Sequence, residues 1–172
     1  MRAVIRHRRF AIAMPAPSRR PAPPVTLLLP PDLLEQTQLE LREASGGHCE
    51  AIVLWAGRPT ADGDALITHL VMPKFESGRD HLTIPPVVRH ELAVWVRSER
   101  LLVFADLHDH PAEAFLSRAD VAAPFSTTNG FYAAVIPDFA VGDPGVEWRL
   151  YEALDGQWHE RPTSSKFHEL SV

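Results

Sequence analysis

The chain has 172 residues, enough for one domain with a full hydrophobic core, and its 45% hydrophobic and 23% charged residues are typical of globular proteins. No apolar run approaches the ~20 residues that a membrane-spanning helix needs. Cys49 is the single cysteine, so an internal disulfide is excluded and any metal site must use His, Asp and Glu. This cysteine usage also fits a cytoplasmic location.

Residues 1–24 differ from the rest of the chain. They contain six arginines, five of the sixteen prolines and no acidic residue, and we expect a disordered basic leader there. The remaining chain then has 11 basic residues against all 22 acidic ones, a formal charge of −11. Such an acidic domain is a poor candidate for binding nucleic acid. We place the domain at residues 25–163 and expect a frayed tail at 164–172.

The first part of the domain predicts a strand, a helix and a second strand. Residues 25–29 are apolar and are followed by two prolines, and residues 32–44 form a helical pattern that ends at two glycines. The apolar segment 50–57 predicts a strand whose only charged residue, Glu50, stands at its start. A carboxylate at a strand end is most simply a solvated side chain, so Glu50 alone indicates no function.

The elements expected next, in order, are a turn (58–64), an antiparallel strand (65–72), a polar loop (73–80), an extended piece (81–84) and a helix from Pro85-Pro86 to about Ser98. His69 lies within the strand, and we interpret it as a strand histidine rather than a ligand.

The most informative stretch is Leu107-His108-Asp109-His110-Pro111, which follows the apolar segment 101–105. In a strand, side chains repeat with period two, so His108 and His110 would point to the same face. Ser117 is a good helix N-cap, and Ser-x-x-Asp would place Asp120 in the first helical turn, facing the histidines. Two imidazoles and one carboxylate, with a fourth position for water, form a catalytic type of zinc site.

A simpler interpretation is open at this point. His-x-His pairs occur by chance on strands, and the Ser-x-x-Asp pattern is also an ordinary helix cap whose carboxylate complements the helix dipole.

The remaining sequence predicts a turn at 126–130, a strand at 131–136, and a hairpin of 146–153 and 157–161 across Asp155-Gly156. His159 and His168 are assigned no role. Strands in adjacent hairpins with helices between the groups indicate an α+β fold.

Four features together resemble the pattern of the JAMM (JAB/MPN-type) zinc metallopeptidase family. They are Glu50 at the head of a strand that closes with Gly57, the motif His108-x-His110-Pro111, Ser117 and Asp120. The likeness is greatest to its compact prokaryotic JAB-like members, and it covers about residues 25–161. It implies an MPN/JAB-like, cytidine-deaminase-like mixed β-sheet flanked by helices. Two features depart from the family: Asp109 stands where Ser or Thr is usual, and the spacing from His110 to Asp120 is one residue shorter than in many members.

The resemblance assigns a role to each residue. His108, His110 and Asp120 would hold one Zn²⁺ per chain, and Glu50 would be the general base. Ser117 would donate to the developing oxyanion, with helix capping as its alternative role. Asp109 should point away from its neighbouring histidines and not bind metal.

The resemblance also implies a substrate, namely the isopeptide or C-terminal peptide bond of a ubiquitin-like or sulfur-carrier protein. Two alternatives are a metallohydrolase of small amides or short peptides, and a non-catalytic scaffold of the same fold.

Overall fold

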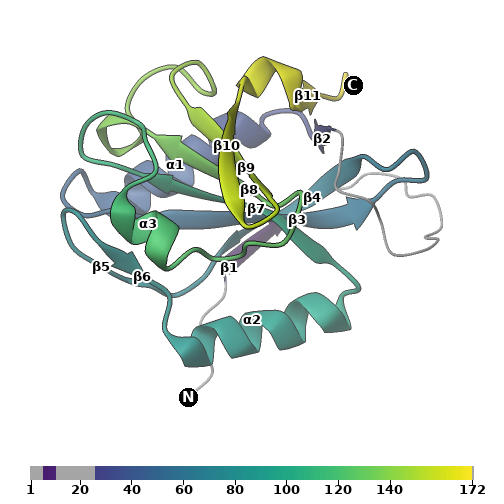
Figure 1. Ribbon diagram of the computed structural model, residues 1–172, viewed down its shortest axis with the longest axis horizontal. Helices are drawn as coiled ribbons and strands as arrows, with labels where there is room; N and C mark the ends of the chain where they lie inside the picture. Colours follow the sequence, from purple (N-terminus) through teal and green to yellow (C-terminus); the bar gives the residue numbers. More distant parts are fainter. Residues whose placement is uncertain (1–5, 11–25, 172) are drawn as a thin grey trace.

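The computed structural model describes residues 6–10 and 26–171, and it shows a curled mixed β-sheet with a few helices around it (Figure 1). The strands of the sheet are β1 (Arg6–Arg9), β2 (Leu27–Leu29), β3 (Ile52–Pro59), β4 (Ala65–Met72), β7 (Leu102–Asp109), β8 (Tyr132–Ile136), β9 (Arg149–Leu154), β10 (Gln157–Arg161) and β11 (Phe167–Glu169). A separate hairpin joins β5 (Glu76–Ser77) and β6 (Leu82–Thr83). The helices are α1 (Leu33–Ser45), α2 (Pro86–Ser98) and α3 (Arg118–Ala122), with 3-10 turns η1 (Asp138–Ala140) and η2 (Thr163–Ser165).

The strand order is β10-β9-β8-β7-β3-β4-β2-β11, and β1 pairs with β4 off this path. Most neighbours are antiparallel, whereas β7/β8, β2/β4 and β2/β11 are parallel. The predicted α+β class with a mixed sheet is therefore confirmed. Among the described residues, the helices are too short or too polar to traverse a lipid bilayer.

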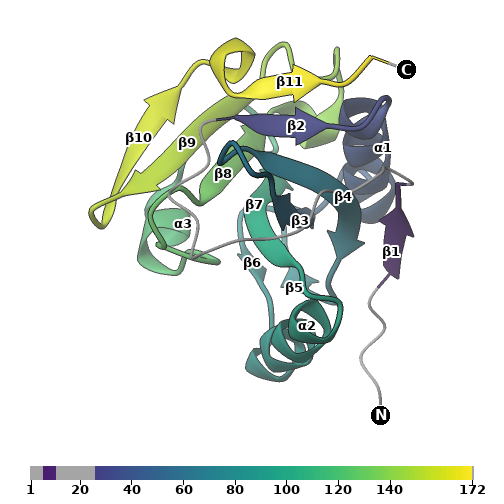
Figure 2. The same ribbon diagram turned by 90° about the vertical axis from the view of Figure 1, so that its right-hand side faces the viewer.

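Helices α1 and α2 cover opposite faces of the central strands (Figure 2). Leu33 and Leu41 of α1 pack in the cluster that holds Val53 and Trp55, whereas Val88 of α2 packs with the residues that point the other way. Trp55 is buried, and its indole N–H donates to Thr37 Oγ1 at 2.9 Å, which satisfies the polar atom inside the core. Both faces of β3 are therefore buried along most of the strand.

The predicted boundaries agree with the observed elements in the central part of the chain. The helix predicted at 32–44 is α1, which ends at Gly46 in the left-handed conformation, at φ 56°. The helix after Pro85-Pro86 is α2, and the strand predicted at 65–72 is β4. Strands β5 and β6, of two residues each, form a short hairpin where a loop and an extended piece were expected.

The two ends of the chain differ from the prediction. Residues 6–9 lie within the segment 1–24 that was expected to be disordered, yet they form β1, and Phe10 packs against the core. Residues 1–5 and 11–25 lie outside the described residues. The segment 164–172 was expected to be frayed, but 167–169 form β11 beside β2, and Leu170 N–H donates to Leu29 O at 2.8 Å. The folded unit therefore extends beyond 25–163 on both sides.

Candidate metal centre

The candidate centre lies where the start of β3 meets the end of β7. Ile52 pairs with His108 in this antiparallel ladder. Just beyond the pair, Asp109 N–H donates to Ala51 O at 3.2 Å, and Ala51 N–H donates to Asp109 Oδ1 at 2.6 Å. Glu50 precedes β3 by two residues, and its N–H donates to Gly78 O at 2.8 Å. The ladder therefore brings Glu50 to the same edge as the two histidines.

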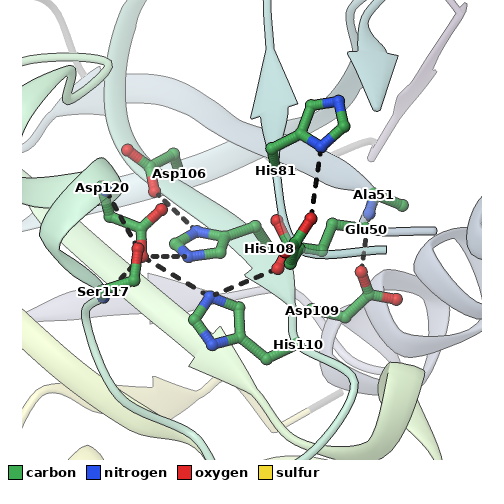
Figure 3. A network of polar contacts seen from close by, with 10 residues as sticks. Glu50, Ala51, His81, Asp106, His108, Asp109, His110, Ser117 and Asp120 are labelled. Atoms are coloured by element: carbon green, nitrogen blue, oxygen red, sulfur yellow. Dashed lines mark hydrogen bonds and ion pairs between the residues drawn. The ribbon is translucent and has the colours of Figure 1, made fainter. Parts of the chain in front are cut away.

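The period of the strand places His108 and His110 on one face, as predicted, and Figure 3 shows both imidazoles turned toward Asp120. Asp120 Oδ2 lies 3.6 Å from His108 Nε2 and 3.5 Å from His110 Nε2. The Phe115 ring packs edge-on against His110, with the ring centroids 5.3 Å apart. The structure therefore brings together the three residues that the sequence predicts as ligands.

Asp120 reaches the histidines because α3 begins with a reciprocal cap. Asp120 N–H donates to Ser117 Oγ at 3.2 Å, and Ser117 N–H donates to Asp120 Oδ2 at 2.7 Å. The same carboxylate oxygen thus faces the cap and the imidazoles. Ser117 performs the capping role that the sequence left open, and this role uses a lone pair of its hydroxyl. The O–H proton is still available for donation, because a serine hydroxyl has one donor and two acceptor sites.

Glu50 lies on the histidine side of the centre, with its Oε1 3.9 Å from His110 Nε2. Its side chain is buried, and burial raises its pKa, although His110 and His108 work in the opposite direction. A carboxylate with a raised pKa is better able to accept a proton near neutral pH than an exposed one. The simple interpretation of Glu50 as a solvated strand end therefore does not apply.

The ligand atoms of His108, His110 and Asp120 lie within 4.8 Å of one another. Ligands ~2.0–2.1 Å from a tetrahedral ion stand about 3.3 Å apart, close to the separations of 3.5 and 3.6 Å. His108 Nε2 is also buried and has no hydrogen-bond partner. A buried nitrogen without a partner is costly, and a metal ion would satisfy it. The three side chains therefore fit a divalent metal, and two nitrogens with one carboxylate are a common donor set for zinc.

The carboxylates around His108 favour positive charge there, which in the metal-free protein is a proton. Burial alone would raise the pKa of Asp120, but the two imidazoles and Ser117 hold it well below its usual range. Burial would also lower the pKa of His108, but Asp106 and Asp120 on either side raise it to about 10 in the metal-free protein. A metal ion at His108 must therefore displace a proton, so metal binding releases protons.

Two carboxylates near the centre have different surroundings. Asp109 points away from both histidines, as predicted, and is fully buried against Ala51 (Figure 3). Asp106 was missed by the sequence reasoning, yet its Oδ1 lies 3.5 Å from His108 Nδ1. The signal was available, since Asp106, His108 and His110 follow the same period of two.

A cavity opens beside the centre. Its wall includes Glu50, Asp106, His108, Ser117 and Asp120, together with residues of the β5–β6 hairpin. The residues that were assigned no role lie elsewhere: His159 is exposed on β10 and His168 on β11.

No protein-family model matches the chain. The chain is similar to a protein of Sinorhizobium fredii (strain NBRC 101917 / NGR234) named probable metalloprotease y4jG, with 31% identity over 119 residues, which are 67% of this chain and 73% of that protein. It is also similar in fold to the solution structure of protein DSY2949 from Desulfitobacterium hafniense. The TM-score is 0.66 at 17% identity, over 86% of this chain and 94% of that one.

Proposed function

The chain belongs to the metalloprotease family that includes the probable metalloprotease y4jG, and from this premise we propose that it is a zinc-dependent peptidase of the JAMM type. The observation that carries the proposal is the convergence of His108, His110 and Asp120 beside the buried Glu50. The likeness of these residues and their spacing to the JAMM pattern supports the finer assignment, including an MPN/JAB-like identity for the sheet.

In this proposal His108, His110 and Asp120 hold one Zn²⁺. When bound, the ion would polarise the substrate carbonyl and lower the pKa of a water molecule from ~15.7 toward ~7. Glu50 would accept a proton from the water molecule that attacks the carbonyl and later deliver it to the leaving amine. Its position beside His110 and its raised pKa support this role.

Ser117 is proposed to stabilise the developing oxyanion with its hydroxyl proton. Its Oγ accepts the Asp120 N–H, which leaves the proton free for the substrate, and Ser117 lines the cavity beside the centre. One side chain can therefore cap α3 and also donate in the transition state, where such donors have their largest effect.

For the substrate, we propose the isopeptide or C-terminal peptide bond of a ubiquitin-like or sulfur-carrier protein. The JAMM resemblance supports this substrate class. The acidic character of the chain outside residues 1–24 would favour a basic surface on the partner.

The test begins with zinc per chain, measured by elemental analysis of protein purified without added metal. We expect about one zinc per chain, lost in Asp120→Ala and kept in Glu50→Gln. Hydrolysis is then measured on a ubiquitin-like protein fused through its C-terminus to a reporter, and on small amides. The parent should cleave the fusion, and Glu50→Gln should not.

Each contrary result has a definite meaning. Full activity of Glu50→Gln would refute the assigned general base. Cleavage of the small amides but not of the fusion protein would mean that the substrate is a small amide rather than a ubiquitin-like protein. A parent that binds no zinc, even after reconstitution, would indicate the non-catalytic scaffold.

A further inference from the structure

Asp106 occupies an unusual position for a carboxylate. It lies in the middle of the sheet on β7, only 4% of its surface is exposed, and its side chain faces the cavity of the metal centre. Burying a carboxylate costs free energy unless it is paired. Within the described residues, its side chain has one polar partner, the Nδ1 atom of His108 at 3.5 Å.

The two nitrogens of His108 therefore have separate surroundings. Nε2 faces Asp120 Oδ2 at 3.6 Å and has no hydrogen-bond partner, whereas Nδ1 faces Asp106 on the opposite side of the ring (Figure 3). An imidazole that binds a metal through Nε2 must carry its remaining proton on Nδ1. A carboxylate that accepts this proton fixes both the tautomer and the rotation of the ring.

Two neighbouring carboxylates, Asp109 and Asp120, accept hydrogen bonds from the backbone, whereas within the described residues the Asp106 side chain meets only His108. Asp120 accepts the N–H of Ser117, and Asp109 accepts the N–H of Ala51. These two residues hold a helix start and a strand pair, respectively. Asp106 supports no such backbone feature, so its contact with His108 is what explains its presence inside the sheet.

We propose that Asp106 is a positioning residue, which holds His108 with Nε2 directed at the metal and so raises the affinity of the centre. The inference rests on the proposed metal site but not on the proposed substrate. His110 has a different support, the ring of Phe115, so the contribution of Asp106 should act through His108 alone.

The test compares Asp106→Asn, Asp106→Ala and Asp80→Asn with the parent. Asp80 lines the same cavity, but its side chain is 89% exposed, so its variant controls for the loss of a nearby charge. Zinc affinity is measured by competition with a chelating dye, and circular dichroism of the metal-free proteins checks folding. Asp106→Ala should weaken zinc binding by roughly 10–100-fold, and Asp80→Asn should leave it within about twofold.

The Asn variant separates positioning from charge. Its amide oxygen still accepts the Nδ1–H, so Asp106→Asn should lose less affinity than Asp106→Ala. In the Co²⁺-loaded protein, proton NMR detects the exchangeable Nδ1–H of each ligand imidazole. We expect one of these protons to exchange faster with water in Asp106→Ala and to be retained in Asp106→Asn.

Affinities of both Asp106 variants within twofold of the parent would overturn the inference, and so would an equal loss in Asp80→Asn. If Asp106→Ala does not fold, Asp106→Asn decides alone. A zinc affinity more than twofold below that of the parent supports the inference, and an affinity within twofold with an unchanged exchange rate overturns it. Asp106-dependent zinc binding in a parent that cleaves no substrate would refute the proposed function and leave the inference standing. If the parent hydrolyses substrate and the Asp106 variants keep the zinc affinity of the parent, the inference is refuted and the proposed function stands. A parent that binds no metal would overturn both the inference and the proposed function.

Discussion

The buried carboxyl group of Asp109 should make the fold less stable as the pH rises. Burial raises its pKa from 3.8 to about 6, and the bond from Ala51 N–H opposes this only in part. The folded state therefore favours the protonated form more than the unfolded state does. The destabilisation is absent below pH ~4, grows as the pH rises through 6, and is complete above pH ~7. This rise of the Asp109 pKa from 3.8 to about 6 corresponds to about 3 kcal/mol of stability.

The substitution Asp109→Asn removes this titration and keeps an oxygen for the Ala51 N–H. Urea unfolding of the metal-free parent and variant at pH 4 and pH 7 gives two stability differences, and comparing them cancels the titration of all other groups. The variant should gain up to about 3 kcal/mol on the parent between the two pH values. A difference that does not change with pH, or that changes in favour of the parent, would refute the assigned burial of this charge.

Three further predictions concern the centre and its supports. Both Ser117→Ala and Ser117→Gly should slow hydrolysis, but only the Ala variant should also lose about 1 kcal/mol of stability, because glycine is tolerated at an N-cap and alanine is not. Kinetics measures the first effect and urea unfolding the second. Unimpaired hydrolysis in both variants would contradict the role of the hydroxyl. His159→Asn and His168→Asn should leave the metal content unchanged by elemental analysis, and zinc loss in either would mean that the ligands are misassigned. Gly57→Ala should lower stability by at least about 2 kcal/mol, because its Cβ would lie within 3.0 Å of the β4 backbone at Leu66; a thermal melt like that of the parent would argue against this close approach.

Local patterns were sufficient for the central part of the fold. Pro85-Pro86 and Gly46-Gly47 mark the start of α2 and the end of α1, and the alternation of β7 correctly orients both histidines. Glu50 could be placed beside them only through the family resemblance, because its neighbour in space is about 60 residues away in the chain.

The edges of the sheet could not be predicted in the same way. β1 is an arginine-rich segment and β11 a short polar one, and neither has the apolar alternation that predicts a strand. Each is ordered by pairing with a strand that is distant in sequence, β4 or β2. Asp106 could not be told from a strand residue by pattern alone, because it lies two residues before the His-x-His pair, within an otherwise apolar segment.

The third ligand belongs to a segment that the protein core barely holds. Helix α3 has five residues, and none of them is buried. A metal ion shared by Asp120 and the two histidines would therefore act as a cross-link that fastens residues 111–128 to the sheet. Removal of the ion by a chelator should loosen this segment first, so limited proteolysis would cut there while the sheet stays intact. The cleft would then owe its shape, as well as its chemistry, to the bound ion.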